Sequence, residues 1–465
     1  MARRESEVND FLQGNFAPWR MEGVAEDLEV TGHVPRELNG TYFRNGPNPA
    51  FEPPGRYHWF DGDGMIHAVT LADGRAHYRN RYVGSAGLRE ERGAGRGLFP
   101  GLLDIDPSEA PRFKNTGNTN IVFHAGRLLA LMEAAFPTRM DARTLETLGE
   151  FDFDGRLFGP MTAHPKMDPE TGEMLFFGYS PFPPYLQYHV ADREGGLVRS
   201  EVIDIAWPTM MHDFAITRDW VVFILCPLVF SFENVKARGG VFSWEPERGT
   251  RIGVMPRSGG NADVRWFATD ASYVFHPMNA FADGDAIVLD VARYARLDFM
   301  SRQSAGDSNF RDENAARLHR WRIDLKGGGV KSTPLDDITA EFPRVDERRL
   351  GRRHRFGYMA AREPEPNEDR QPLWNAIKKY DLERGSAETR RFGAGNGVGE
   401  PVFVPRTEAA AEDDGWVLVL AYDAARNASD FHVLDARDLA GEPVARVHIP
   451  HRVPYGFHGN WVAAA

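Results

Sequence analysis

The chain has 465 residues, of which 42% are hydrophobic and 26% are charged, as is usual for a soluble globular protein. It is too long and too apolar to be a disordered segment or a small disulfide-stapled scaffold. Its 55 Lys and Arg against 67 Asp and Glu give a formal net charge of -12, which repels a phosphate backbone, so we expect no nucleic-acid partner.

The N-terminal residues and the single cysteine indicate where the protein resides. The first ten residues, "MARRESEVND", turn acidic instead of leading into an apolar stretch, so we expect no secretory signal. Cys226 is the one cysteine, which excludes an intramolecular disulfide and favours a reducing compartment. No apolar run approaches the roughly 20 residues of a membrane-spanning helix. We therefore predict a soluble, cytoplasmic protein, with peripheral contact to a membrane left open.

Short apolar or alternating runs recur along the chain, separated by turn residues. With 46 Gly and 31 Pro as punctuation and little 3.6-residue periodicity, these runs predict a mostly β protein. In chain order they are "GTYFRNG" (40–46), "MIHAVTL" (65–71), "RAHYRNRYV" (75–83), "RLLALME" (127–133), "EMLFFGY" (173–179), "WVVFIL" (220–225), "DAIVLDV" (285–291), "WVLVLAYD" (416–423) and "FHVLDA" (431–436).

So many short strands in one open sheet would leave exposed edges, and a propeller is the closed β architecture that reaches this length as one unit. No strict 40-residue repeat is visible, so a standard repeat propeller is not supported. We predict one domain over residues 1–465. Two polar or Gly-rich stretches, 84–115 and 299–320, interrupt the strand rhythm, and we expect them to pack over one face and shape a substrate entrance.

Four histidines stand in similar local contexts. His164, His212 and His276 each lie at the end of an apolar segment that a turn and a second apolar strand follow, and His458 lies in "YGFHGNW". If each belongs to the innermost hairpin of a different blade, all four imidazoles point at one axis. Four imidazoles without a thiolate suit Zn, Cu, Fe or Ni, and the residues alone do not choose the metal.

Imidazoles that bind a metal usually donate their second N–H to a carboxylate. Three acids adjoin apolar residues that suggest an interior position, namely Glu133, Glu341 and Glu400. An unpaired carboxylate in such a position would be costly to ionise, so these three are the candidate partners of the histidines.

The chain resembles the carotenoid cleavage oxygenase family, which also includes lignostilbene dioxygenases, isoeugenol oxygenases and the animal retinoid isomerohydrolase. The motifs occur in the family's order from one end of the chain to the other. They are "NGTYFRNGPNP" (39–49), "YHWFDGDGMIHAV" (57–69), "TAHPKMDPETGE" (162–173), "MMHDFAIT" (210–217), "WEPERG" (244–249), "FHPMNAF" (275–281), "GEPVFVPR" (399–406) and "FHGNW" (457–461).

This resemblance implies a seven-bladed β-propeller with a dome of helices and loops over its top face. It implies a ferrous iron, Fe(2+), on the axis, bound by the four histidines, with the three glutamates each hydrogen-bonded to one imidazole and one histidine left without such a partner. It also puts Thr119 beside an open coordination position. The residues that match the family's site are His164, His212, His276, His458, Glu133, Glu341, Glu400 and Thr119.

The reaction that the resemblance implies is oxidative cleavage of a conjugated C=C bond with O2, which gives two carbonyl products. The substrate is a small apolar conjugated molecule, and no protein partner is implied. We expect Met132, Phe60 and Phe275 to line the substrate pocket. The stilbene-cleaving branch has a lysine at the position of Met132, and an uncharged thioether suits an apolar polyene better than a phenolate. We therefore favour a carotenoid or apocarotenoid, with a stilbene or phenylpropene as the alternative.

Two other functions remain open from the sequence. The same scaffold could carry a metal that acts as a Lewis acid in an isomerase or hydrolase, which would need no O2. A propeller can also serve as a binding module, because fold alone does not decide function.

Overall fold

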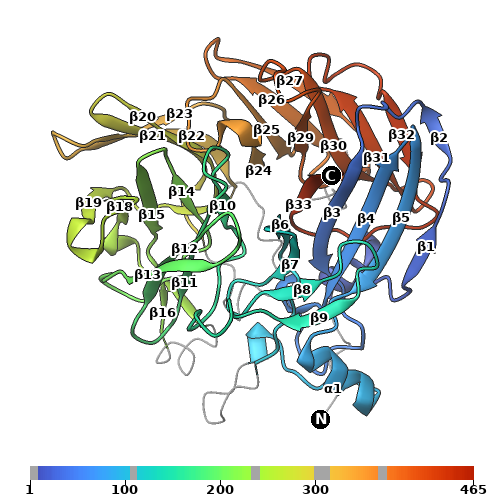
Figure 1. Cartoon of the computed structure of the whole chain (residues 1–465), viewed down its shortest axis with the longest axis horizontal. Coiled ribbons are helices and arrows are strands. Elements are labelled where there is room, and N and C mark those ends of the chain that lie inside the picture. Colours follow the sequence, from blue (N-terminus) through green and yellow to red (C-terminus); the bar gives the residue numbers. More distant parts are fainter. Residues whose placement is uncertain (1–8, 105–112, 232–240, 298–314, 365–373, 465) are drawn as a thin grey trace.

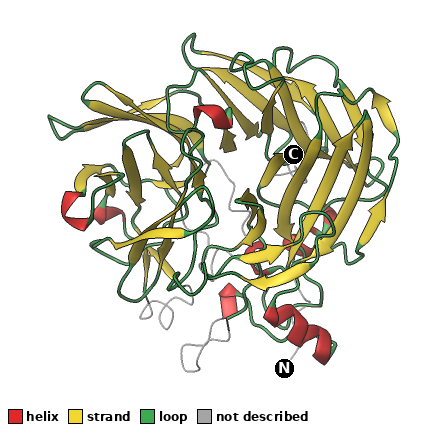
Figure 2. Ribbon diagram, in the orientation of Figure 1, coloured by secondary structure: helices red, strands yellow, loops and turns green. Residues whose placement is uncertain are grey.

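The computed structural model describes residues 9–104, 113–231, 241–297, 315–364 and 374–464. Within these ranges, seven antiparallel sheets of four or more strands are arranged around a common centre (Figure 1). The protein is a seven-bladed β-propeller, which confirms the predicted fold class. Figure 2 shows how little helix accompanies the strands.

The first four blades come in chain order. Blade 1 contains β1 (Gly23–Ala25), β3 (Gly40–Pro47), β4 (Gly64–Ala72), β5 (Arg75–Tyr82) and β33 (Gly459–Ala463), and blade 2 contains β6 (Asn120–His124), β7 (Arg127–Leu131), β8 (Thr138–Met140) and β9 (Thr147–Glu150). Blade 3 contains β10 (Lys166–Met167), β11 (Met174–Tyr179), β12 (Leu186–Ala191) and β13 (Leu197–Val202), and blade 4 contains β14 (Phe214–Ile216), β15 (Trp220–Leu225), β18 (Thr250–Pro256) and β19 (Arg265–Thr269). The ribbon β16 (Leu228–Phe230) with β17 (Phe242–Trp244) branches from blade 4 between β15 and β18.

The last three blades complete the ring. Blade 5 contains β20 (Tyr273–Asp283), β21 (Ala286–Tyr294), β22 (Arg317–Asp324) and β23 (Val330–Pro334), and blade 6 contains β24 (Ala340–Arg344), β25 (Phe356–Ala361), β26 (Ala376–Asp381) and β27 (Ser386–Arg391). Blade 7 contains β2 (Val30–Gly32), β28 (Gly397–Val398), β29 (Val402–Pro405), β30 (Gly415–Asp423), β31 (Ala428–Asp435) and β32 (Ala445–His448).

Strands from opposite ends of the chain close the ring twice. Strand β33 pairs with β3 in blade 1, where Tyr42 lies opposite Trp461. Strand β2 pairs with β32 in blade 7, where Val30 lies opposite Val447. Because each of these two blades takes a strand from the far end of the chain, backbone hydrogen bonds within the blades hold the N-terminal and C-terminal parts of the chain together.

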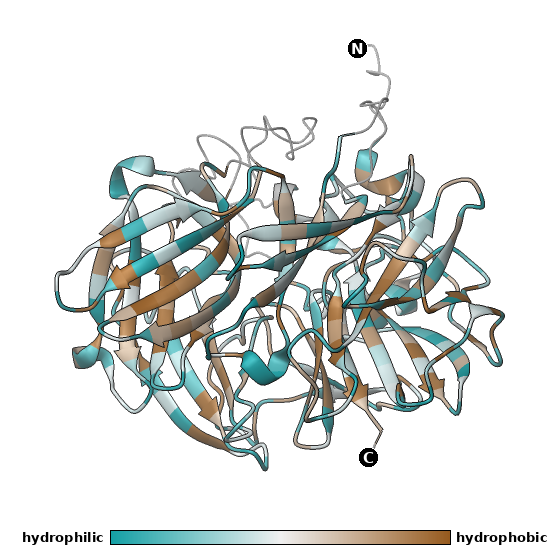
Figure 3. Cartoon of the chain, turned by 90° about the horizontal axis from the view of Figure 1, so that it is seen from above, coloured by the Kyte–Doolittle hydropathy of each residue, from teal (hydrophilic) through white to brown (hydrophobic). Residues whose placement is uncertain are grey.

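The hydrophobic core lies between neighbouring blades. Between blades 7 and 1, for example, Tyr42 and Val69 pack with Trp416 and Phe431, all of them buried. The ring centroids of Tyr42 and Phe431 are 5.1 Å apart. Seen from above, the hydrophobic residues lie mainly along the strands and the hydrophilic ones gather in the turns (Figure 3). Burial between blades is therefore what holds the ring together.

The helical elements are few and short. The α-helix α1 (Ala86–Ala94) begins after Ser85, whose hydroxyl accepts the N–H of Leu88, and ends at Gly95, which has a positive φ of 67°. Among the described residues, the 3-10 helices are η1 (Asp10–Leu12), η2 (Gly14–Phe16), η3 (Trp59–Asp61), η4 (Leu102–Asp104), η5 (Pro246–Arg248), η6 (Asn261–Asp263) and η8 (Glu347–Arg349).

The two predicted insertions have different outcomes. Residues 84–115 contain α1 and η4, and several of them line a cavity of about 880 Å³. Residues 105–112 lie outside the described residues. Of residues 299–320, those up to 314 lie outside the described residues, and 317–320 begin strand β22 of blade 5.

In the part of the chain that the structure describes, no helix has the length and hydropathy that crossing a bilayer requires. The predicted cytoplasmic location and the absence of nucleic-acid and protein partners stay predictions.

Ion pairs connect three blades around Asp168, which lies in the β10–β11 turn. Its carboxylate pairs with Arg257, which follows β18, and with Arg352, which precedes β25. Burial alone would raise the pKa of Asp168, but the hydrogen bond and charge of Arg257, together with the backbone N–H groups of Glu170 and Thr171, outweigh it and lower that pKa from 3.8 to about 2. Asp168 therefore stays charged in the folded protein below the pH at which the unfolded chain takes up the proton.

We predict that this carboxylate makes the fold sensitive to acid. Its folded pKa lies below its unfolded value, so its stabilisation is complete above about pH 4 and is lost as the pH falls towards 2. The loss should be roughly 2 kcal/mol, measured by urea unfolding at pH 5 and at pH 2.5. Asp168→Asn should be less stable at pH 5 and should lose correspondingly less on acidification. An unchanged pH dependence in that variant would contradict the prediction.

Candidate metal centre

Four histidines from four blades meet near the centre of the ring. His164 precedes β10, His212 precedes β14, His276 lies in β20, and His458 precedes β33. One ligand nitrogen from each lies within 4.8 Å of the others, and all four side chains are buried or nearly so. The histidines that the sequence singled out are therefore brought together, each near the inner end of its blade.

At His276, a local irregularity of the backbone directs the side chain towards the centre. The register between β20 and β21 shifts on both sides of Pro277, directly after His276. Such a bulge re-aims a side chain that a regular strand would direct elsewhere. The Thr162 hydroxyl accepts the N–H of His164 at 3.1 Å and donates to the carbonyl oxygen of His212 at 3.2 Å, which ties two of the segments together.

The spacing of the ring nitrogens fits a metal ion. His212 Nε2 lies 2.9 Å from His164 Nε2 and 3.2 Å from His276 Nε2. Two nitrogen ligands about 2.1 Å from one ion and at right angles to each other would be about 3.0 Å apart. Without a cation or a proton between them, these converging lone pairs would repel, so the donor set fits an ion that accepts imidazole ligands.

Three of the four imidazoles have a glutamate partner. Because a carboxylate is an acceptor, each Nδ1 carries the hydrogen and each Nε2 presents its lone pair to the centre. The Nδ1-to-oxygen distances are 2.5 Å for His212 with Glu133, 2.5 Å for His276 with Glu341 and 3.0 Å for His458 with Glu400. These are the three acids that the sequence indicated, each with a different histidine.

The fourth imidazole has a different environment. His164 Nδ1 lies 3.8 Å from Asp213 Oδ2, too far for a hydrogen bond, and the Asp213 carboxylate pairs with Lys166 Nζ at 2.8 Å. Burial lowers the pKa of His164 well below its ordinary value, and the other three imidazoles act in the same direction. His164 is therefore neutral at physiological pH, as a metal ligand must be.

The glutamates change the charge balance of the site. Burial lowers the pKa of His276 despite the opposing effect of Glu341, whereas for His212 the Glu133 carboxylate outweighs burial and raises the pKa. Burial alone would raise the pKa of Glu400, but Arg344 and then His458 lower it to about 2. The glutamates thus place negative charge behind the imidazoles, which favours a bound cation.

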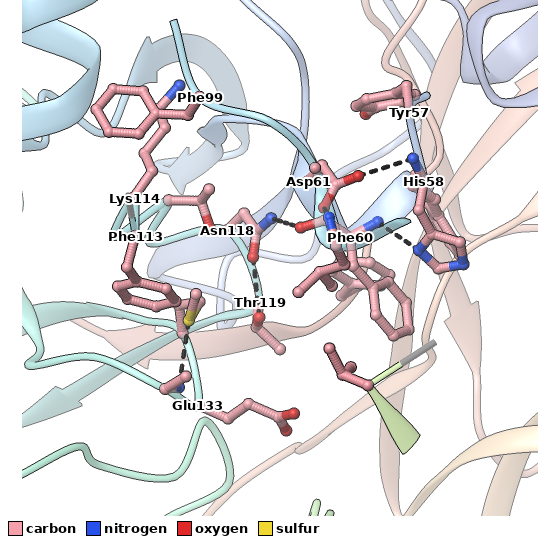
Figure 4. Close-up of a pocket in the computed structure, with 18 of the residues that line it drawn as sticks. Tyr57, His58, Phe60, Asp61, Phe99, Phe113, Lys114, Asn118, Thr119 and Glu133 are labelled. Atoms are coloured by element: carbon pink, nitrogen blue, oxygen red, sulfur yellow. Dashed lines mark hydrogen bonds between the residues drawn. The ribbon is translucent and has the colours of Figure 1, made fainter. Parts of the chain in front are cut away.

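Thr119 lies at the inner end of blade 2, directly before β6. Its hydroxyl donates to Asn118 Oδ1 at 3.0 Å, and Asn118 Nδ2 in turn donates to the carbonyl oxygens of Phe60 and Gly62 at 2.8 and 2.7 Å. Figure 4 shows this chain of hydrogen bonds above Glu133. The orientation of Thr119 is therefore set by the segment that carries η3.

A cavity of about 880 Å³ opens onto three of the four histidines, His212, His276 and His458. Most of its lining is apolar, as in sites that enclose small hydrophobic molecules. The predicted pocket residues Met132, Phe60 and Phe275 all line it, and so do Thr119, Glu133, Glu341, His212, His276 and His458.

Several residues of the cavity were not expected from the sequence. Phe342 directly follows Glu341, and its φ of 52° is a conformation that a residue with a side chain rarely adopts. Its ring lies 5.5 Å from that of His276 in a stacked arrangement. Tyr179, at the end of β11, donates its hydroxyl hydrogen to Glu133 Oε1 at 2.8 Å. The sequence offered one signal for Tyr179, namely its position at the end of the apolar run that forms β11.

A buried group of charges forms another part of the cavity wall. Lys114 Nζ lies 2.6 Å from Asp63 Oδ1 and 2.5 Å from Glu91 Oε2. Figure 4 shows Lys114 beside Phe99 and away from Glu133. Since Glu91 belongs to α1, this group attaches the helix to the segments around Asp63 and Lys114.

Comparison with known proteins gives consistent matches over nearly the whole chain. Residues 16–463 match the family described as retinal pigment epithelial membrane protein. The chain is 36% identical to an isoeugenol monooxygenase of Pseudomonas nitroreducens, over 97% of each chain, and 36% identical to a carotenoid cleavage oxygenase of Mycobacterium tuberculosis, over 99% of each chain. It superposes on the crystal structure of a lignostilbene dioxygenase of Pseudomonas brassicacearum with a TM-score of 0.91, 34% identity and full coverage of both chains.

Proposed function

Because the chain belongs to the retinal pigment epithelial membrane protein family, which includes the carotenoid cleavage oxygenases, we propose that it cleaves a conjugated C=C bond oxidatively. The protein is an enzyme of the oxygenase class. We propose that Fe(2+) is its metal and that His164, His212, His276 and His458 bind it. The products are two aldehydes or ketones.

The reaction is balanced without an external reductant. The substrate loses both bonds of one C=C pair, and each carbon gains one atom of the same O2 molecule as a carbonyl oxygen. When bound, a ferrous ion supplies the one-electron chemistry with O2 that amino-acid side chains lack. No residue is required as a nucleophile.

The protein's own residues hold and orient the reacting partners. The three glutamates keep each imidazole in the tautomer whose Nε2 is free to bind a metal. Phe275 and Phe342 place aromatic surface next to these imidazoles, where it contacts an apolar substrate and excludes water. The position of the substrate along the cavity then determines which double bond lies next to the metal.

One observation carries the proposal. Four imidazole nitrogens, three of them set by carboxylates, converge beside a mostly apolar cavity of about 880 Å³. A passive binding module has no need of this arrangement, and a Lewis-acid enzyme that acts on polar substrates would have a more polar pocket.

We rank a carotenoid or apocarotenoid first as the substrate class. Met132 and Phe60 contribute apolar surface to the cavity, and a thioether stands where a phenol-binding lysine would be needed. The alternative is a stilbene or phenylpropene, which the similarity to an isoeugenol monooxygenase and a lignostilbene dioxygenase favours.

Product analysis tests both the proposed reaction and the proposed substrate class. The iron-loaded enzyme is incubated with parallel panels of apocarotenoids and hydroxystilbenes under ¹⁸O₂, and the products are identified by mass spectrometry. We expect two carbonyl products, ¹⁸O in both, dependence on O2, and loss of activity on chelation that Fe(2+) restores. Turnover of one panel at least tenfold faster than the other decides the substrate class.

Two results would contradict the proposal. Conversion of substrate without O2 would indicate an isomerase or a hydrolase. A protein that binds no iron and converts neither panel would favour a binding module.

The predicted peripheral contact with a membrane also stays a proposal. Phe113 and Phe182 line the cavity and are 55% and 59% exposed, so apolar surface surrounds part of its opening. Such a surface would allow an apolar substrate to pass from a lipid phase into the cavity.

A further inference from the structure

Two of the three glutamates are held by fixed groups of the inner strands. Glu341 accepts the backbone N–H of its neighbour Phe342 at 2.6 Å. Glu400 accepts the backbone N–H of Gly459 at 2.8 Å and pairs with Arg344 at 3.1 Å. These donors belong to β24 and β33, so each of the two carboxylates has a backbone N–H of an inner strand as a partner.

Glu133 is held differently. It lies in the turn after β7, and its side chain is 16% exposed, against 4% for Glu341 and 3% for Glu400. Among the described residues, its hydrogen bonds come from two side chains, His212 at Oε2 and Tyr179 at Oε1. A glutamate with this freedom would sample several rotamers if the tyrosine did not fix it.

Tyr179 is well placed to do so. It ends β11, lines the cavity and packs against the hydrophobic cores of the neighbouring blades. A tyrosine hydroxyl keeps its proton at neutral pH, so it donates to the carboxylate. With Oε1 engaged by Tyr179 at 2.8 Å, Oε2 faces His212 Nδ1 at 2.5 Å.

We propose that Tyr179 is a positioning residue for the metal site: by fixing Glu133 it sets the ring plane and tautomer of His212. This inference rests on the proposed metal-binding function. It makes the position of His212 depend on a side chain in the cavity wall. A substrate that moves the Tyr179 ring therefore also alters His212.

The test measures metal affinity and needs no turnover. Fe(2+) and Co(2+) affinities of the full-length protein are determined by competition with a chromophoric chelator. Tyr179→Phe should bind each metal about tenfold more weakly than the wild type, in the range of losses seen when a ligand's outer partner is removed. The visible spectrum of the Co(2+) form should change as well, because the geometry of one ligand changes.

The matched control is Tyr188→Phe. Tyr188 lies in β12 of the same blade, is fully buried, and its hydroxyl has no hydrogen-bond partner among the described residues. The variant removes the same atom from the same sheet, and its metal affinities should stay within twofold of the wild type.

A double-mutant cycle with Glu133→Ala separates positioning from a general packing effect. Once Glu133 is absent, adding Tyr179→Phe should cost less than twofold in affinity. An equal loss in both backgrounds, or a Tyr179→Phe variant with wild-type affinity, would overturn the inference while leaving the metal site intact. A wild-type protein that binds no metal would instead refute the proposed function itself.

Discussion

His212→Ala should lose its bound iron and at least about 100-fold of its activity. His212 is the central member of the cluster, since its Nε2 lies 2.9 Å from His164 Nε2 and 3.2 Å from His276 Nε2. Its removal takes away one of four donors and leaves Glu133 without the imidazole that it orients. Iron content per chain after anaerobic reconstitution, together with turnover, measures the effect.

The control for this variant is His319→Ala. His319 lies on β22, is not part of the histidine cluster, and hydrogen-bonds Ser332. It should keep one iron per chain and wild-type turnover. A His212→Ala protein with full iron content would contradict the proposed coordination, whatever its activity.

Arg344→Met should destabilise the fold by about 3–5 kcal/mol, because it leaves the buried Glu400 carboxylate without its cation. The guanidinium also donates to the carbonyl oxygen of Gly459 at 2.9 Å and to Asn460 Oδ1 at 3.0 Å, and thereby ties β24 to β33. Urea unfolding of the metal-free protein, followed by tryptophan fluorescence, measures the loss.

Arg322→Met provides the comparison. Arg322 pairs with Asp283 at 2.6 Å, but both side chains are well exposed, so its loss should cost less than about 1 kcal/mol. Adding Glu400→Gln to Arg344→Met should recover part of the stability, because the uncompensated charge disappears. Equal stabilities of the Arg344 and Arg322 variants would contradict the assigned role of the buried pair.

The central strands of the blades were predictable because their residues carry a clear pattern. Runs such as 220–225 and 416–423 are apolar on both faces, as strands between two packed blades must be, and they form β15 and β30. The convergence of the four histidines followed from their similar local contexts, and their assignment as ligands followed from the resemblance to a family.

The remaining features depend on contacts between distant segments. Strand β22 begins inside the stretch that was predicted to be an insertion. Its start was missed because Arg317, Arg320 and Arg322 give this strand the composition of a loop. The roles of Tyr179 and Phe342 arise from a hydrogen bond to a residue 46 positions away and from a strained backbone, neither of which leaves a local pattern. The pairing of β2 with blade 7 is likewise set by the closed ring.

The place of His458 next to β33 imposes an order on assembly. The imidazole of His458 reaches the axis when β33 pairs with β3, so all four histidines come together once the ring of blades is closed. An ion that binds only the closed ring stabilises it relative to the open form. The stabilisation is about 4 kcal/mol when the ion's concentration is 1,000-fold above its Kd. A metal ion bound by all four histidines would therefore also stabilise the closed ring, and its removal would make the ring easier to open.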